Sequence, residues 1–178
     1  MTLILPEYES EATEPVVCQL LASLVAVRRP KTITEAGTYR GHSALLMADA
    51  CRYANFGHVW TYDPFDHGVQ EYIDKNDLSE WCTWVQDDYM GSLRNDIEFA
   101  FIDASGFRDD GRRDASIREV HFFATLERLR PKGIVCVHDT HEDFDWSDGD
   151  GGKSLHRIRA ECQINLDMGR GLSIHYAG

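Results

Sequence analysis

Apolar and polar residues alternate along the chain in blocks that predict a regular succession of helices and strands. The first block, Val16–Val27, has the length and apolar density of a buried helix, and an Arg-Arg-Pro sequence ends it. The β-branched run Thr32–Glu35 stops at a glycine turn, a helix-forming stretch covers Ser43–Tyr53, and an apolar run returns at His58–Tyr62. These blocks predict one strand–helix–strand unit behind an N-terminal helix.

The same succession continues to the end of the chain. Further strands are expected at Thr83–Gln86, Ile97–Ile102, Gly133–Val137 and Leu172–Tyr176, and further helices near Val69–Leu78, Ala115–Leu129 and Lys153–Cys162. Strands that are apolar on both faces and alternate with helices predict a parallel sheet covered on both sides. The fold class is therefore α/β with a doubly wound, mostly parallel sheet, and residues 1–178 are expected to form a single domain.

Composition and charge narrow the expected partners. The chain has 30 acidic and 18 basic residues, and its formal net charge of -12 would repel a phosphate backbone, so nucleic acid is not an expected partner. The cysteines show no Cys-x-x-Cys spacing, and the N-terminus lacks the positive charge of a signal peptide. No apolar run reaches the roughly 18 residues of a membrane span. These features predict a cytoplasmic protein without a membrane partner.

Acidic residues follow most of the predicted strands. In an open α/β sheet, ligands bind at the carboxyl ends of the strands, so the residues directly after each strand are the candidates. The acids at these positions are Glu35, Asp63, Asp87, Asp88, Asp103 and Asp139. Taken singly, each is more readily explained as a turn or helix-cap residue. The ordered series favours a binding site.

The first of these loops reads Glu35-x-Gly37-x-x-x-Gly41-x-Ser43, with glycines where the backbone turns tightly beside a ligand. The spacing differs from the Gly-x-Gly-x-x-Gly of a nicotinamide site, where a helix N-terminus holds a pyrophosphate. S-adenosylmethionine has no phosphate but carries a cationic sulfonium and an ammonium, which suit acids at strand ends. Asp63 is placed to accept both ribose hydroxyls.

With these residues in place, the sequence resembles the class I S-adenosylmethionine-dependent methyltransferases, particularly the compact branch related to macrolide-sugar and catechol-type O-methyltransferases. The matching segments are Ile33–Leu45, Val59–Phe65, Ile97–Asp103, Leu129–Thr140 and Met168–Ile174. The resemblance implies a seven-stranded sheet whose last strand is antiparallel, with the cofactor lying across the first loop. The implied cofactor-binding residues are Glu35, Gly37, Thr38, Tyr39, Gly41, Ser43, Asp63, Asp87, Asp88 and Asp103.

The resemblance also implies a catalytic and metal-binding group. In metal-dependent members, the acids after the fourth and fifth strands share a Mg²⁺ ion that also binds the substrate hydroxyl, and Asp103 and Asp139 occupy those positions, with Thr140 as the third expected ligand. Two departures bear on this expectation. Gly106 stands where related enzymes often place a base, and Thr140 stands where a catechol-type enzyme has Asn. His138 and His141 are the candidate bases, and His138 joins Asp103 and Asp139 in the predicted catalytic set.

Several alternatives stay open at the level of sequence. The expected activity is methyl transfer to a hydroxyl of a small molecule, with or without Mg²⁺. A protein that binds S-adenosylmethionine without transferring its methyl group and a nicotinamide-dependent oxidoreductase are the competing hypotheses. Phe65, Tyr72 and Trp81 either line an acceptor pocket or fill the core. The acidic segment Glu142–Asp150 is either a lid or a solvated surface, and a homodimer is an open alternative to a monomer.

Overall fold

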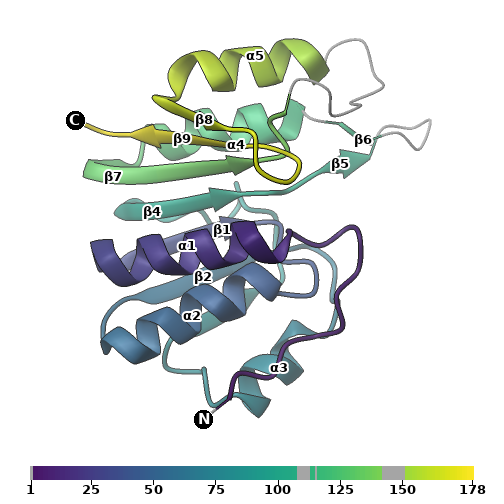
Figure 1. The fold of residues 1–178 in the computed structure, drawn as a ribbon, viewed down its shortest axis with the longest axis vertical. Helices are drawn as coiled ribbons and strands as arrows, with labels where there is room; N and C mark the ends of the chain where they lie inside the picture. Colours follow the sequence, from purple (N-terminus) through teal and green to yellow (C-terminus); the bar gives the residue numbers. More distant parts are fainter. Residues whose placement is uncertain (1, 108–112, 115, 142–150) are drawn as a thin grey trace.

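A seven-stranded sheet forms the centre of the computed structural model, which describes residues 2–107, 113–114, 116–141 and 151–178 (Figure 1). The strands lie in the order β3-β2-β1-β4-β7-β9-β8. Neighbours from β3 to β7 are parallel, whereas β9 is antiparallel to both β7 and β8. The strands are β1 (Thr32–Ala36), β2 (His58–Tyr62), β3 (Cys82–Val85), β4 (Ile97–Ile102), β7 (Leu129–His138), β8 (Ile164–Leu166) and β9 (Leu172–Tyr176).

Helices cover both faces of this sheet. They are α1 (Pro15–Arg28), α2 (His42–Ala54), α3 (Val69–Lys75), α4 (Ser116–Leu126) and α5 (Gly151–Glu161). Phe99 and Phe101 of β4 belong to the apolar cluster that includes α1, α2 and α3, while Ala100 and Ile102 belong to the cluster that includes α4 and α5. Alternate residues of one strand therefore face different helical layers, and the predicted doubly wound sheet with its antiparallel last strand is confirmed.

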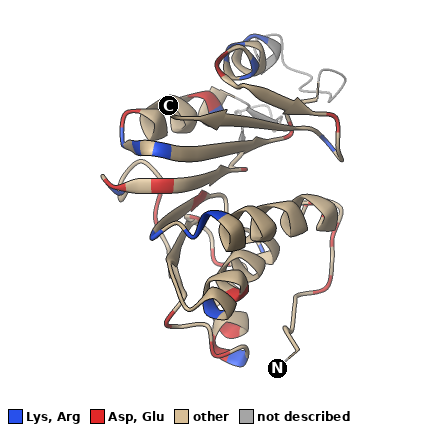
Figure 2. Ribbon diagram, turned by 60° about the vertical axis from the view of Figure 1, so that its left-hand side comes forward, with Lys and Arg blue, Asp and Glu red and all other residues tan. Residues whose placement is uncertain are grey.

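The first helix shows how the sequence produces one of these layers. Its buried residues include Val17, Leu21 and Val25, which recur every four residues and so share one face. Proline lies at its start, where its missing N–H costs nothing, and Arg29 ends it in the left-handed conformation. Figure 1 shows α1 and α2 side by side, and Figure 2 shows the charged residues mostly on loops and helix ends.

Some predicted boundaries were wrong. The helix expected to reach Leu129 ends at Leu126, because Leu129 pairs with Ile97 and begins β7, which also starts earlier than the predicted Gly133. A register shift between Ile97 and Phe99 lets the ladder accommodate Pro131, which has no N–H to donate.

Two features of the fold were not predicted. One is the short strand β8, and the other is the hairpin of β5 (Gly106–Phe107) and β6 (Arg113–Asp114). The possible lid at residues 142–150 lies outside the described residues. Within the described ranges, no helix is both long and apolar enough to cross a membrane.

Candidate active site

Glycines shape the loop after β1. Gly37 has a φ of +91° and Gly41 a φ of +88°, a region that L side chains rarely adopt. A Cβ atom added to Gly37 would lie 2.8 Å from the backbone of Ala104, so the loop packs directly against the chain that follows β4. The glycine spacing therefore has a steric cause, and it brings the ends of β1 and β4 together.

Glu35 is a fully buried acid beneath this loop. Its carboxyl group accepts hydrogen bonds from the hydroxyls of Ser43 and Thr61, and the Thr61 and Thr38 hydroxyls are 2.5 Å apart. Burial raises the pKa of Glu35 to about 8, although both hydroxyl groups act in the opposite direction. Glu35 thus links β1, β2 and the start of α2, and it is mostly protonated at neutral pH.

Asp63 joins the end of β2 to the same loop. Its Oδ2 atom accepts a hydrogen bond from the backbone N of Tyr39 at 2.9 Å, and its Oδ1 atom accepts one from the backbone N of Phe65 at 3.0 Å. Each carboxylate oxygen has more than one acceptor position. Asp63 therefore fixes the loop and still has acceptor positions for a ligand hydroxyl.

The two acids that follow β3 lie in different surroundings. Asp87 accepts a hydrogen bond from Ser92 Oγ at 2.6 Å within its own loop, whereas Asp88 lines a cleft at the strand ends. The buried ring of Tyr89 comes next in the chain, and its centroid lies 5.0 Å from that of His121 on α4. Burial lowers the pKa of His121, so its imidazole is neutral at pH 7.

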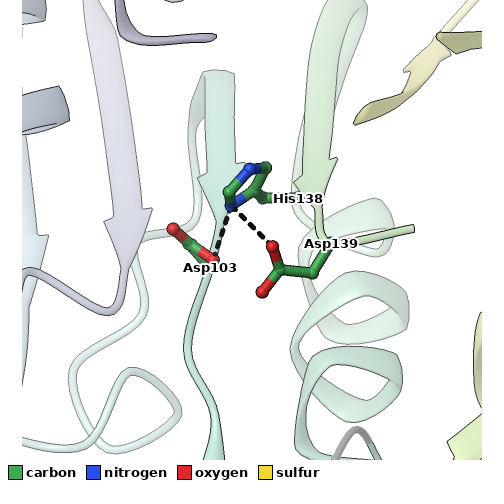
Figure 3. A group of neighbouring side chains, drawn as sticks. All are labelled: Asp103, His138 and Asp139. Carbon is green, nitrogen blue, oxygen red and sulfur yellow. Dashed lines mark hydrogen bonds and ion pairs between the residues drawn. The ribbon is translucent and has the colours of Figure 1, made fainter. Parts of the chain in front are cut away.

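Asp103, His138 and Asp139 form a compact group at the ends of β4 and β7 (Figure 3). His138 Nδ1 lies 3.0 Å from Asp103 Oδ1 and 3.2 Å from Asp139 Oδ1. One potential ligand atom from each residue lies within 4.8 Å of the others. The predicted catalytic residues are therefore adjacent in space, as neighbouring parallel strands require.

Arg118 of α4 lies inside this group, with its side chain only 1% exposed. Its Nη2 atom is 3.0 Å from Asp103 Oδ1 and 2.9 Å from Asp139 Oδ2, so one nitrogen bridges both carboxylates. Its Nε atom donates to the Ala104 carbonyl at 2.9 Å, and its Nη1 atom donates to the His138 carbonyl at 2.7 Å. The guanidinium thereby links the ends of β4 and β7.

Two further charged residues complete the network. His138 Nε2 lies 2.6 Å from Oε2 of Glu14, the residue before α1. Arg170, just before β9, places its Nε atom 2.7 Å from Asp139 Oδ1 and 3.3 Å from Glu14 Oε1. Three acids thus face two arginines and a histidine whose nitrogens both lie beside carboxylate oxygens.

The pKa values in this network reflect mutual stabilisation. Burial alone would raise the pKa of Asp103, but His138, Arg118 and the Thr13 hydroxyl together lower it below its ordinary value. Burial opposes the charged form of His138, yet Asp103, Glu14 and Asp139 raise the pKa of His138 to about 9. His138 consequently carries a proton at neutral pH, which works against a role as general base.

The other two candidates after β7 lie apart from these contacts. Thr140, the expected third metal ligand, is buried, and its hydroxyl accepts a hydrogen bond from Ser173 Oγ at 2.8 Å. His141 follows as a half-buried residue whose backbone N donates to the Arg170 carbonyl at 3.0 Å. Neither residue is among those that line the cleft in the described part of the chain.

A cleft of about 340 Å³ runs along these strand ends. The predicted cofactor residues that line it are Gly37, Thr38, Tyr39, Gly41, Ser43, Asp63, Asp88 and Asp103. Glu35 lies beneath the cleft, and Asp87 bonds within its own loop. Of the predicted pocket aromatics, Phe65 lines the cleft, whereas Tyr72 and Trp81 pack against the core.

Several residues of the site were missed by the sequence analysis. The helix α4 contributes two polar residues, Arg118 and His121. Three others come from segments that are distant in the sequence, namely Thr13, Glu14 and Arg170. The spacing of Arg118 and His121, three residues apart on one helix, was the only available signal that they share a face.

A protein-family model described as a methyltransferase domain matches residues 34–140, which include the first loop and all the strand-end acids discussed above. The chain therefore belongs to this methyltransferase family. The resemblance predicted from the sequence is confirmed, and so is the prediction of a methyltransferase.

Solved structures share the whole fold at low sequence identity. The SAH-bound Podospora anserina methyltransferase PaMTH1 has a TM-score of 0.74 and 16% identity, with 94% of this chain and 81% of that one covered. A Bacillus cereus O-methyltransferase in complex with SAH has a TM-score of 0.70 and 18% identity, covering 96% and 84%. The Streptomyces achromogenes O-methyltransferase TomG, involved in tomaymycin synthesis and in complex with SAM, has a TM-score of 0.69 and 18% identity. The match covers 97% of this chain and 84% of that one. Among curated protein sequences, none matches the chain.

Proposed function

We propose that the chain binds S-adenosylmethionine in the cleft and transfers its methyl group to a hydroxyl of a small molecule. The observation that carries the proposal is the single cleft that joins the first loop, Asp63, Asp88 and Asp103 at the carboxyl ends of parallel strands. Two structural neighbours described as O-methyltransferases in complex with SAH or SAM support the choice of cofactor and acceptor atom.

The cleft offers a distinct environment for each part of the cofactor. Asp63 would accept hydrogen bonds from the ribose hydroxyls, because its oxygens are fixed by Tyr39 and Phe65. At the β3 end, Asp88 and the neutral His121 offer polar partners for adenine beside the Tyr89 ring. Thr38, Tyr39 and Ser43 line the cleft along the glycine loop, where the amino-acid end of the cofactor would lie.

Methyl transfer of this kind depends mainly on alignment. The acceptor oxygen bonds to the methyl carbon in line with the carbon–sulfur bond that breaks, S-adenosylhomocysteine leaves, and the hydroxyl proton passes to water; holding the two reactants in that geometry supplies a large part of the rate enhancement. Asp103 and Asp139 both line the cleft and are held rigidly by Arg118. These residues would therefore fix the wall against which the acceptor lies.

Magnesium fits this donor set poorly. Mg²⁺ prefers near-octahedral oxygen ligands, but both oxygens of Asp103 and of Asp139 already lie beside protein donors. The bridging position that a metal ion would take between the two acids is held by Arg118 Nη2. The proposed transfer is therefore built on the residues of the chain alone.

Calorimetry with S-adenosylhomocysteine tests the proposal first. One binding site per chain is expected, and Asp63→Asn should weaken binding about tenfold to a hundredfold, because it replaces a charged acceptor of the ribose hydroxyls. Glu98→Gln, at a distant strand position, is the matched control. Saturation by NADH in place of S-adenosylhomocysteine would instead favour an oxidoreductase.

Turnover distinguishes an enzyme from a binding protein. The chain would be incubated with S-adenosylmethionine and a panel of hydroxylated small molecules, with S-adenosylhomocysteine formation as the readout. Acceptor-dependent formation supports the proposed transfer. Tight binding of the cofactor without turnover on any acceptor would favour the protein that binds without transferring.

A further inference from the structure

Every oxygen of Asp103 and Asp139 lies close to a cationic or hydroxyl group of the protein, and the contact of Asp139 Oδ1 with Arg170 is an ion pair without hydrogen-bond geometry. Asp103 Oδ2 accepts a hydrogen bond from Thr13 Oγ1 at 2.6 Å, and Asp103 Oδ1 faces Arg118 and His138 at 3.0 Å each. Asp139 Oδ2 lies 2.9 Å from Arg118, and Asp139 Oδ1 lies 2.7 Å from Arg170. Each of these four oxygens therefore has a cationic or hydroxyl partner.

The charges around the two acids also balance. Asp103, Asp139 and Glu14 are matched by Arg118, Arg170 and a histidine whose two nitrogens both face carboxylates. A guanidinium stays charged at all accessible pH values. A divalent cation bound to the same oxygens would lie within a few ångströms of permanent positive charge, in a site where little water screens it.

Arg118 is suited to act as a permanent substitute for such a cation. It is buried, it spans both carboxylates through one nitrogen, and two backbone carbonyls at the strand ends fix its plane. The planar fork of a guanidinium holds its partners in a defined orientation, as a coordination shell does for a metal ion. Arg118 also lines the cleft together with the two acids.

We infer that Arg118 takes the place of a divalent metal ion in this chain, and that Asp103 and Asp139 bind no metal. Arg118 is then a positioning residue, which holds the two acids against the cleft. The inference rests on the proposed function only for its consequence in catalysis, namely that methyl transfer proceeds without added metal. The claim about metal binding concerns the chain itself and is independent of turnover.

Manganese binding tests the inference without any need for activity. The full chain would be titrated with Mn²⁺ and free Mn²⁺ followed by electron paramagnetic resonance, with and without saturating S-adenosylhomocysteine. The wild type should leave the free-ion signal unchanged at protein concentrations up to the millimolar range. Loss of one equivalent of signal that Asp103→Asn and Asp139→Asn both restore would overturn the inference.

The same titration can also detect manganese binding that is gained when Arg118 is replaced. Arg118→Gln removes the cation that bridges the two acids, so the variant should bind Mn²⁺ at least tenfold more tightly than the wild type. Arg157→Gln, an exposed arginine on α5 that pairs with Glu119, is the matched control and should resemble the wild type. If the Arg118→Gln variant folds but binds Mn²⁺ no better than the Arg157→Gln control, the result contradicts the inference that Arg118 takes the place of a metal ion. If Arg118→Gln does not fold, the wild-type titration with its two acid variants decides the matter.

The rate of methyl transfer tests the consequence of the inference for catalysis. With an acceptor identified, the wild-type rate should be the same in a chelator as in millimolar Mg²⁺, whereas a rate that falls at least tenfold in the chelator would overturn the inference. Failure of the proposed function would appear separately, as an absence of S-adenosylhomocysteine binding in calorimetry, and would leave the manganese result readable.

Discussion

At the ends of β1 and β2, Glu35 and Asp63 accept hydrogen bonds from hydroxyl and backbone N–H groups, whereas at the ends of β4 and β7 the acids lie among cations. The hydrogen-bond partners of the first pair are neutral groups. The second pair is neutralised by Arg118 and its neighbours. One edge of the sheet thus combines acids with neutral partners and acids with cationic partners from the protein itself.

The largest expected effect comes from removing the cation that the second half depends on. Arg118→Gln leaves Asp103 and Asp139 buried without their shared partner, and breaking a buried ion pair in this way costs about 3–5 kcal/mol of unfolding free energy. Urea denaturation measures the loss. Arg157→Gln should change stability by less than about 1 kcal/mol because its pair is exposed. Equal losses in the two variants would remove the distinction between the halves.

The first half should be most sensitive at Gly37. Gly37→Ala adds a Cβ atom 2.8 Å from backbone atoms of Ala104 at a φ of +91°, so both strain and a clash arise. Gly68→Ala has a similar φ of +79° but nothing within 4 Å of the added atom. Strain alone costs about 1–2 kcal/mol, so Gly37→Ala should lose more than Gly68→Ala and bind S-adenosylhomocysteine at least tenfold more weakly. Similar results for both variants would mean that the close approach to Ala104 does not matter.

The two halves also predict different pH dependences. Glu35 has a pKa raised from 4.5 to about 8, so the folded state holds a proton that the unfolded state releases, and its contribution to stability falls as the pH rises from about 4.5 to about 8. Glu35→Gln should remove this part of the pH dependence. Urea unfolding at pH 5, 6, 7 and 8 measures it, with the exposed Glu127→Gln as control. Parallel curves for wild type and Glu35→Gln would contradict the buried, protonated acid.

The smallest effect is spectroscopic. His138 has a pKa raised from 6.5 to about 9, so its contribution to stability is complete below about pH 6.5 and is lost as the pH rises through about 9. Nitrogen NMR of labelled histidines should show both ring nitrogens of His138 protonated at pH 7.5. His121, whose pKa is lowered by burial, should be neutral in the same spectrum and serves as the internal control. A neutral His138 at pH 7.5 would contradict the prediction that its neighbouring carboxylates keep its imidazole protonated.

The comparison also explains which parts of the site the sequence could predict. Glycine spacing and acids directly after strands are local signals, and the predicted residues Gly37, Gly41, Asp63, Asp88 and Asp103 all line one cleft. The ion network depends on Arg118, Glu14 and Arg170, which meet only through the tertiary fold. No local pattern distinguishes a buried arginine on α4 from a solvated one.

The same reasoning applies to the fold. Strands buried on both faces gave near-continuous apolar runs, and their alternation with helices predicted a parallel sheet covered on both sides. The short edge strand β8, whose residues are largely exposed, carries too little apolar pattern to stand out. The start of β7 was hidden because Pro131 normally excludes a strand, and only pairing with β4 across a register shift allows it.

A crystal structure of the chain grown with S-adenosylhomocysteine and MnCl₂ tests the methyl-donor site and the metal-free site together. Cofactor density is expected along the loop from Gly37 to Gly41, with the ribose hydroxyls beside Asp63, and no anomalous manganese peak is expected between Asp103 and Asp139. An empty glycine loop, with the cofactor bound elsewhere or not at all, would contradict the proposed methyl-donor site. A manganese peak that displaces the Arg118 guanidinium would contradict the metal-free site.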